Sequence, residues 1–189
     1  MNLAVQDILF LQNRVAYLRD EQAYKKIFFH YHSSLYRFAF HIVHNGETAD
    51  EIVSDVMMKI WSLGNKLAHV DKLNLYLFTS VKNSSLTFLA KNKQRWSAST
   101  KELEETTITH SDEPEYHLLL SEMERKIETA IASLPPQCQL VYRLIKEEGF
   151  SHKDVCAVLE VSPNTIETHM RIALKRIKLA LDNYLLSKK

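Results

Sequence analysis

Glycine and proline are scarce in this sequence, which has three glycines and four prolines among 189 residues. A many-stranded sheet needs tight turns that these two residue types favour, so their scarcity favours an all-α fold. No stretch approaches the about 18 uncharged apolar residues that a membrane-spanning helix needs, so we expect no membrane insertion. Charges are spread through the N-terminal segment, which argues against a secretory signal.

Cysteine is equally scarce, and the two cysteines lie in apolar helical contexts. Cys138 and Cys156 are therefore expected to be reduced, buried thiols of a cytoplasmic protein. The sequence contains no Glu-x-x-His, His-Glu-x-x-His or Cys-x-x-Cys motif and no phosphate-binding glycine loop. The nine histidines are interpreted as scattered surface or groove residues. We expect no metal site, no cofactor and no enzymatic activity.

A net charge of +1 hides a very uneven distribution of charge along the chain. Residues 72–101 contain six Lys/Arg and no acid, whereas residues 102–128 contain nine acids against two bases, a net charge of −7. Residues 162–189 contain six Lys/Arg against two acids, a net charge of +4. The two basic segments are therefore candidate polyanion-binding faces on either side of an acidic segment.

The spacing of apolar residues divides the chain into two helical domains. It predicts four helices in the first half of the chain, over residues 3–19, 20–44, 47–62 and about 73–96. These helices would form a domain of residues 1–96. Residues 97–119 are rich in Ser, Thr and Glu without periodicity, which predicts a flexible acidic linker. Residues 120–189 are predicted to form a second small helical domain.

Two short helices in the second domain are joined by a tight link at residues 160–162, a pattern typical of a helix-turn-helix. Ser151 is expected to cap the first of these helices, with Asp154 completing a capping box. Ser162 is expected to cap the second helix, with Pro163 at its first position. The second helix would then be the one that enters the DNA major groove.

The two faces of that second helix differ in chemistry. The expected packed residues of the helix pair are Val155, Cys156, Leu159, Ile166, Met170, Ala173, Leu174 and Ile177. The outward side chains are of types that read base edges or contact phosphates: Ser162, Pro163, Asn164, Thr165, Glu167, Thr168, Arg171 and Lys175. An ordinary helical hairpin with a solvated face, and an ion pair between Glu167 and Arg171, remain alternatives at this point.

Three segments resemble bacterial extracytoplasmic-function (ECF) sigma factors. The segment LPPQCQLVYRLIKEEGFSHKDVCAVLEVSPNTIETHMRIALKRI resembles their C-terminal DNA-binding domain. YHSSLYRFAFHIVHNGETADEIVSDVMMKIW and YLFTSVKNSSLTFL are similar to their core-binding segment and to the helix that follows it. Glu160 departs from the family, which usually has Gly or Asn in the link, so its backbone is expected to differ or to be mildly strained.

The resemblance implies an RNA polymerase sigma factor of ECF type, which directs core polymerase to specific promoters and assists promoter opening. The first domain would bind core polymerase and open the downstream promoter element, and the second would bind the upstream element as duplex DNA. Outward residues of the helix over 47–62 are candidates for the polymerase contact: Asp50, Glu51, Asp55, Met58 and Ser62. Regulators of the LuxR type share part of the helix-turn-helix pattern, so a two-domain regulator that binds DNA without polymerase is the alternative.

Promoter opening requires cations interleaved with aromatic and amide side chains that hold unstacked bases of a single strand. In the family, the loop equivalent to residues 64–72 binds an extruded base, which makes Asn65 and His69 candidates. The full candidate set for the downstream element is Asn65, Lys66, His69, Tyr76, Lys82, Asn83, Lys91, Lys93 and Arg95. The family also implies an anti-sigma factor as a partner, which could hold the protein at the membrane, and association with the nucleoid during initiation.

Overall fold

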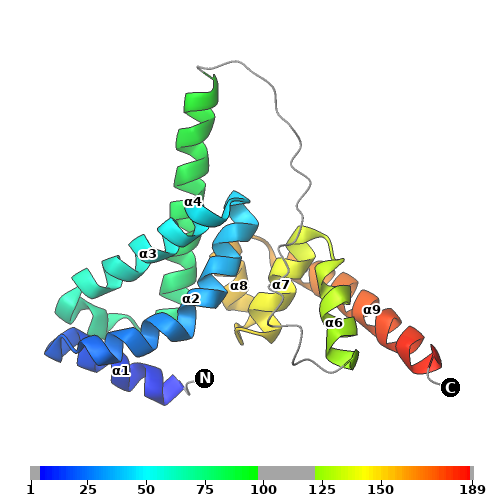
Figure 1. Ribbon diagram of the computed structural model, residues 1–189, viewed down its shortest axis with the longest axis horizontal. Coiled ribbons are helices and arrows are strands. Elements are labelled where there is room, and N and C mark those ends of the chain that lie inside the picture. The colour runs from blue at the N-terminus through cyan, green and yellow to red at the C-terminus, as the bar shows by residue number, and fades with distance from the viewer. Residues whose placement is uncertain (1–4, 98–121, 188–189) are drawn as a thin grey trace. The chain divides into compact units, whose positions relative to one another are not determined.

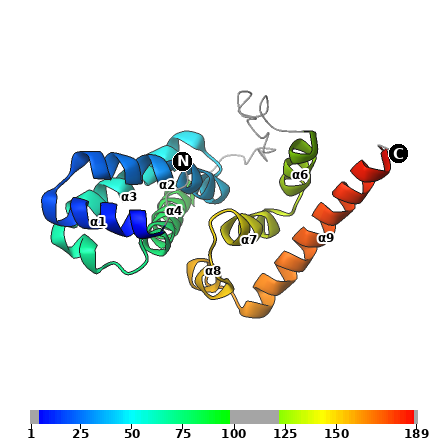
Figure 2. The same ribbon diagram turned by 90° about the horizontal axis from the view of Figure 1, so that it is seen from below.

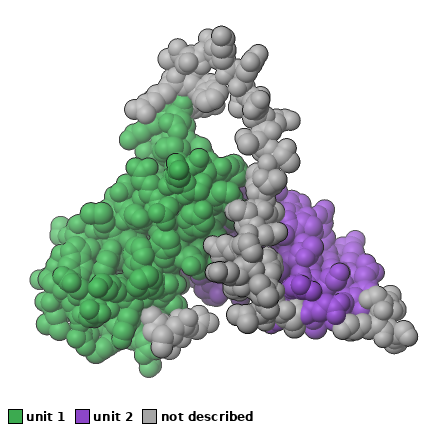
Figure 3. Space-filling model, viewed as in Figure 1, with its two compact units in different colours: residues 1–103 green, residues 104–189 purple. Residues whose placement is uncertain are grey.

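The computed structural model describes the backbone of residues 5–97 and 122–187, and the side chains of residues 6–92 and 122–184. Every regular element in these ranges is helical, which confirms the predicted all-α class. The chain divides into two compact units, residues 1–103 and 104–189 (Figure 3). The predicted linker lies outside the described residues, except for Ser97 at the end of a helix.

The first unit is a bundle in which the other helices pack around the second helix, α2 (Figure 1). Its elements are α1 (Val5–Leu18), α2 (Glu21–Val43), α3 (Gly46–Ser62), the 3-10 helix η1 (Gly64–His69) and α4 (Leu73–Ser97). The helix α2 packs against α1, α3 and α4, and α3 also packs against α4. Because η1 packs mainly against α1, the short segment between α3 and α4 is held by the first helix of the chain.

Short polar side chains set the boundaries of α2 and α3. Asp20 caps α2 by accepting hydrogen bonds from the backbone amides of Gln22 and Ala23, at 2.9 and 3.0 Å. The hydrogen bond from Ala23 is the largest cause that lowers the pKa of Asp20. His44 ends α2 in the left-handed region at φ 54°, and Asn45 caps α3 through the Thr48 amide at 2.9 Å. Both helix ends are therefore specified locally.

The core of the first unit is aliphatic with two central phenylalanines. Ile27 and Leu35 of α2 and Ile60 of α3 are fully buried. Phe38 of α2 meets Phe78 of α4 edge to face, with ring centroids 5.1 Å apart. Burial of side chains of this size contributes about 1.5–3 kcal/mol each, so α2, α3 and α4 hold one another in place.

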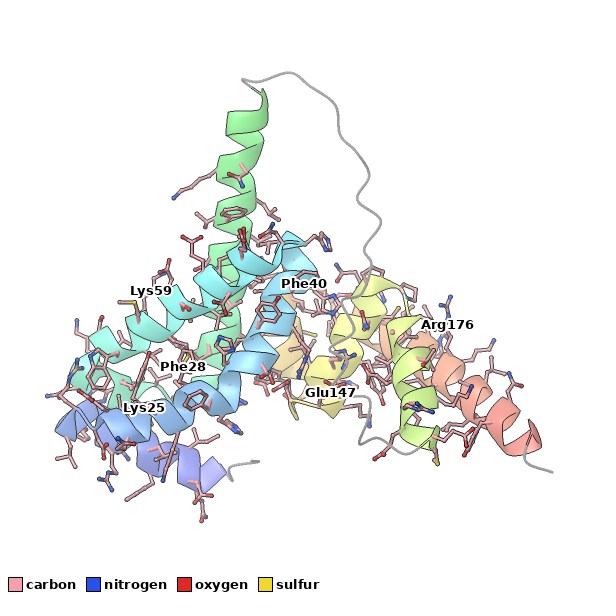
Figure 4. The ribbon with its side chains drawn as sticks, viewed as in Figure 1. Lys25, Phe28, Phe40, Lys59, Glu147 and Arg176 are labelled. Atoms are coloured by element: carbon pink, nitrogen blue, oxygen red, sulfur yellow. The ribbon has the colours of Figure 1, made fainter. Side chains whose placement is uncertain are left out.

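A row of half-buried rings follows one side of α2 at four-residue spacing. Its members are Tyr24, Phe28, His32, Tyr36 and Phe40, of which Phe28 and Phe40 are labelled in Figure 4. Successive centroids lie 4.9 to 6.5 Å apart. The row borders α3, where Trp61 meets Tyr24 at 5.1 Å and Asp50 lies 3.1 Å from the Nε2 atom of His32. Ring contacts and one polar contact thus join α2 to α3.

In the described residues of the second unit, three helices pack against the last one (Figure 2). Its elements are α6 (Glu122–Ala132), α7 (Pro136–Lys146), α8 (His152–Leu159) and α9 (Pro163–Ser187). The helices α6, α7 and α8 each pack against α9, and α7 also packs against α8. One core cluster joins α6, α7 and α9, and its buried members are Ala130, Ile131, Leu134, Cys138, Ala173 and Ile177.

Arg143 of α7 ties α7 to α6 at the edge of this core. Its guanidinium pairs with Glu128 of α6 and lies 2.6 Å from the carboxylate of Glu147, which is labelled in Figure 4. Burial alone would lower the pKa of Arg143, but the two carboxylates outweigh it and raise that pKa above its usual value. Two of the helices that support α9 are therefore also joined by charge.

Candidate DNA-binding and polymerase-binding sites

The link between α8 and α9 has the geometry of a helix-turn-helix. Ser151 accepts from the Asp154 amide at 3.1 Å and Asp154 accepts from the Ser151 amide at 3.3 Å, so the predicted capping box is present. Glu160 ends α8 in the left-handed region at φ 58° and ψ 42°. A non-glycine residue in that region is strained, which confirms the expectation from its departure from the family pattern.

The two helices pack through fewer apolar side chains than the sequence predicted. Val155 and Ile166 are fully buried as expected, and Met170 is 7% exposed. Cys156 and Leu159 are only half-buried, whereas Val158 is fully buried. The helix α8 is short, and it has more apolar side chains than its packed side can bury. The prediction that Leu174 packs inward is wrong. Its side chain is 49% exposed, since Ala173 and Ile177 already fill the core side of α9.

The start of α9 holds its own polar side chains in place. The Thr165 amide donates to the Ser162 hydroxyl at 3.2 Å, and the two hydroxyls lie 2.8 Å apart. The Thr168 hydroxyl donates to the Asn164 carbonyl at 2.8 Å. The predicted cap at Ser162 is therefore present, and the three candidate hydroxyls, those of Ser162, Thr165 and Thr168, already have partners at this end of the helix.

The candidate DNA-contacting side chains form one exposed face over the first turns of α9. Thr165 is half-buried, and the exposed members are Ser162, Pro163, Asn164, Glu167, Thr168, Arg171 and Lys175. Both Glu167 and Arg171 belong to the described residues, and the structure shows no ion pair between them. The face therefore offers an amide, a carboxylate and cations to a partner, the groups that distinguish base edges in the major groove.

Two further residues of α9 make contacts that the sequence did not predict. Nδ1 of His169 lies 3.2 Å from Sγ of Cys138 on α7, and Nη1 of Arg176 donates to the Ser133 carbonyl at 2.9 Å. Burial raises the pKa of the Cys138 thiol, while the nearby Arg176 opposes that shift. Both contacts position α9 on α7 and on the α6–α7 turn, and no local pattern indicates them because they span more than 30 residues of sequence.

The outward face of α3 matches the stripe predicted from sequence. All five of its candidate residues are exposed: Asp50, Glu51, Asp55, Met58 and Ser62. Met58 is 66% exposed, which is unusual for a large apolar side chain, and the Ser62 hydroxyl donates to the Met58 carbonyl at 2.9 Å. Phe29 of the neighbouring α2 is 75% exposed. Exposed apolar atoms beside acids are typical of a protein-binding surface.

The candidate residues for the downstream element lie on η1 and α4. Asn65, Lys66 and His69 project from η1 and are exposed, as are Asn83 and Lys91 of α4. Tyr76 is half-buried, so part of its ring packs in the unit and part of it is open to a partner. The structure thus gathers three of the candidates on one short segment of six residues.

Three other candidates for the downstream element are not among these exposed side chains. Lys82 is only 6% exposed, contrary to the expectation that it is open to DNA. It lies on the same side of α4 as the buried Phe78 and Val81, the side that packs into the bundle. Lys93 and Arg95 lie on the last turns of α4, where the side chains fall outside the described residues.

The described residues contain neither a metal-binding cluster nor a membrane-spanning helix. Within residues 5–97 and 122–187, no group of three or more His, Cys, Asp or Glu side chains could hold a metal ion. Within those ranges, no helix is long and apolar enough to cross a membrane. Both cysteines are free thiols.

Two family models match the chain in the order of its two units. The model for sigma-70 region 2 matches residues 27–95, and the model for sigma-70 region 4 matches residues 124–177. Together they span well over half of the chain, which therefore belongs to the sigma-70 family of transcription initiation factors. The chain is therefore an RNA polymerase sigma factor, and regions 2 and 4 are the two that the resemblance to the extracytoplasmic-function type implied. The match to region 2 rejects the alternative of a LuxR-like regulator, and the family is one of non-enzymatic factors.

Solved structures share the fold. The sigma factor RpoE in complex with the anti-sigma factor NepR, from Bartonella quintana, superposes with a TM-score of 0.58 at 22% identity, covering 84% of this chain and 96% of that one. CnrH in complex with the cytosolic domain of CnrY superposes with a TM-score of 0.53 at 15% identity, covering 94% and 98%. Among curated protein sequences, none matches the chain significantly.

Proposed function

We propose that this sigma factor divides its work between its units as the resemblance implies. Residues 1–96 bind core polymerase and open the downstream promoter element, residues 97–119 link the domains, and residues 120–189 bind the upstream element as duplex DNA. The observation that carries this proposal is the exposed polar and cationic face on the first turns of α9, outside a helix-turn-helix core. Such a face suits the major groove, where a recognition helix places its N-terminal residues on base edges.

The exposed stripe of α3 is proposed as the main contact with core polymerase. It combines the acids Glu51 and Asp55 with the exposed side chain of Met58, while the opposite side of α3 is buried in the bundle. An interface core that mixes an apolar anchor with flanking charge gives both affinity and orientation. Phe29 of α2 adds a second exposed apolar side chain to the same unit.

The segment η1 and the exposed side of α4 are proposed to bind the single strand of the downstream element. Asn65, Lys66 and His69 offer an amide, a cation and an imidazole on one exposed turn, and Asn83 and Lys91 extend this surface along α4. These groups fit bases that have left the stack and the backbone that joins them.

An anti-sigma factor is a further proposed partner, because the two similar solved structures are of sigma factors, one titled as bound to the anti-sigma factor NepR and the other to the cytosolic domain of CnrY. We also propose a cytoplasmic location with association to the nucleoid during initiation. An anti-sigma factor that is itself anchored would hold the protein at the membrane without any insertion of the chain.

The proposed division of work predicts tight association with core polymerase and weak binding of duplex DNA by the free protein. Co-purification of the full chain with core polymerase tests the first part, and titration of labelled promoter duplex with the chain alone tests the second. Failure to associate with polymerase, together with nanomolar binding of a duplex site by the free chain, would overturn the proposal.

A further inference from the structure

A buried glutamine of α1 donates hydrogen bonds to two carbonyls of the segment that carries the candidate base-binding residues, one within η1 and one directly after it. Gln12 is 2% exposed, and its side-chain Nε2 donates to the Leu67 carbonyl at 2.7 Å and to the Val70 carbonyl at 2.8 Å. A glutamine amide nitrogen carries two N–H donors, so both are used on this one segment. These contacts link residues 55 and 58 positions apart in the sequence.

Backbone hydrogen bonds mark both boundaries of η1. The Lys66 amide donates to the Leu63 carbonyl and the Val70 amide to the Leu67 carbonyl, each at 3.1 Å. Val70 then leaves the helix with an extended backbone, at φ −85° and ψ 103°, so its carbonyl points away from any following helical turn. Gln12 supplies the donor that this carbonyl would otherwise lack inside the unit.

The same anchor determines which side chains of the segment face outward. Leu67 is fully buried against α1, whereas its neighbours Lys66 and His69 are exposed, as is Asn65 one residue earlier. Fixing the Leu67 and Val70 carbonyls therefore fixes the backbone on both sides of His69. Pre-positioned groups bind a partner without first having to become ordered.

We infer that Gln12 is a positioning residue for recognition of an unpaired base of the downstream element. The inference rests on the proposed function of η1, whose side chains would touch the base, while Gln12 itself acts through the backbone of residues 67 and 70. Its role is to hold Asn65, Lys66 and His69 in one arrangement before the single strand arrives. The first helix of the chain thereby contributes to promoter recognition without reaching DNA.

The test uses the full chain with core polymerase on promoter templates that are already unpaired over the downstream element. Transcription is compared for the four bases at each position of the displaced strand. The wild type should discriminate at one position by about 5- to 150-fold, the range for one mismatched base. Gln12→Met keeps the length of the side chain and removes both donors, and it should reduce that discrimination to less than about threefold.

The matched control is Gln6→Met, the same change at an exposed position of α1. It should leave discrimination unchanged. Affinity for core polymerase and preference at the upstream element should be unaffected in both variants, since Gln12 is buried and belongs to neither the α3 stripe nor the exposed face of α9. In an Asn65→Ala background, Gln12→Met should cause little further loss of base discrimination, because both substitutions act on the same base-binding segment, η1.

Full base discrimination by folded Gln12→Met protein would overturn the inference, as would a uniform loss of transcription with unchanged discrimination. If Gln12→Met does not fold, Gln12→Asn keeps an amide that is too short to reach both carbonyls and is judged by the same two criteria. The proposed function of η1 has a separate outcome. If Asn65→Ala and His69→Ala leave every base preference intact, η1 does not recognise the base, regardless of the result for Gln12→Met.

Discussion

Glu167 is an unusual residue to present to a polyanion. Phosphates repel a carboxylate unless it meets a donor, and the donor that the major groove offers is the exocyclic amine of cytosine. Because no ion pair joins Glu167 to Arg171 one turn later, the exposed carboxylate is available for such a contact. The absence of this pair argues against the purely structural alternative for Glu167.

Glu167→Gln should therefore change the base preference at one position of the upstream element. A library of upstream elements transcribed by each variant measures this directly. Lys175→Ala is the contrasting variant, since loss of a phosphate contact weakens all promoters alike and reduces the salt dependence by about one unit of slope. Identical preferences for wild type and Glu167→Gln would mean that specificity lies in other side chains of α9.

The two thiols should differ in reactivity. Cys138 is 2% exposed, and burial raises its pKa, so the thiol stays protonated and inert at neutral pH. Cys156 is only half-buried. We expect alkylation of the native protein to modify Cys156 alone, and alkylation after unfolding to modify both thiols.

Mass spectrometry after brief treatment with iodoacetamide checks this expectation. In the control variant Cys156→Ala, native protein should remain unmodified over the same time. Modification of Cys138 at a rate equal to that of Cys156 would show that the contact between α7 and α9 opens readily.

Among the helices, α3 carries the proposed polymerase contact, which a single substitution can test. Asp55→Arg reverses a charge in the middle of the exposed stripe and should weaken association with core polymerase. Surface substitutions usually change stability within about 0.5 kcal/mol, so the melting temperature should hardly move. Association constants and thermal unfolding curves of the same preparations separate the two effects.

Asp182→Arg is the matched control, because it makes the same charge change at an exposed acid of the other unit. It should leave association with polymerase near the wild-type value. Normal assembly and transcription by Asp55→Arg would place the polymerase contact on another face.

Helix boundaries could be predicted from the sequence because their causes are local. The capping box of Ser151 and Asp154 and the caps at Ser162 involve residues within three positions of one another. Burial of single side chains depends on distant neighbours, which explains why Lys82 was expected to be open and Leu174 to be buried. The hydrogen bonds of Gln12 could not be predicted from the sequence for the same reason, since their acceptors lie on another element.

At the level of the whole molecule, the helix-turn-helix alone would not have distinguished an initiation factor from a regulator that shares it. The order of two helical domains does, because region 2 and region 4 models match the first and second units in turn. Periodicity and composition predicted that order, whereas the assignment of each surface depends on exposure, which only the folded chain provides.

The most direct test of the account is transcription by core polymerase reconstituted with the full chain, with mapping of the transcript starts across the genome of the source organism. The account predicts a defined set of starts that require the chain and share an upstream and a downstream element at constant spacing. It also predicts that Glu167→Gln changes the first element without changing the second. Starts identical to those of core polymerase alone would contradict it.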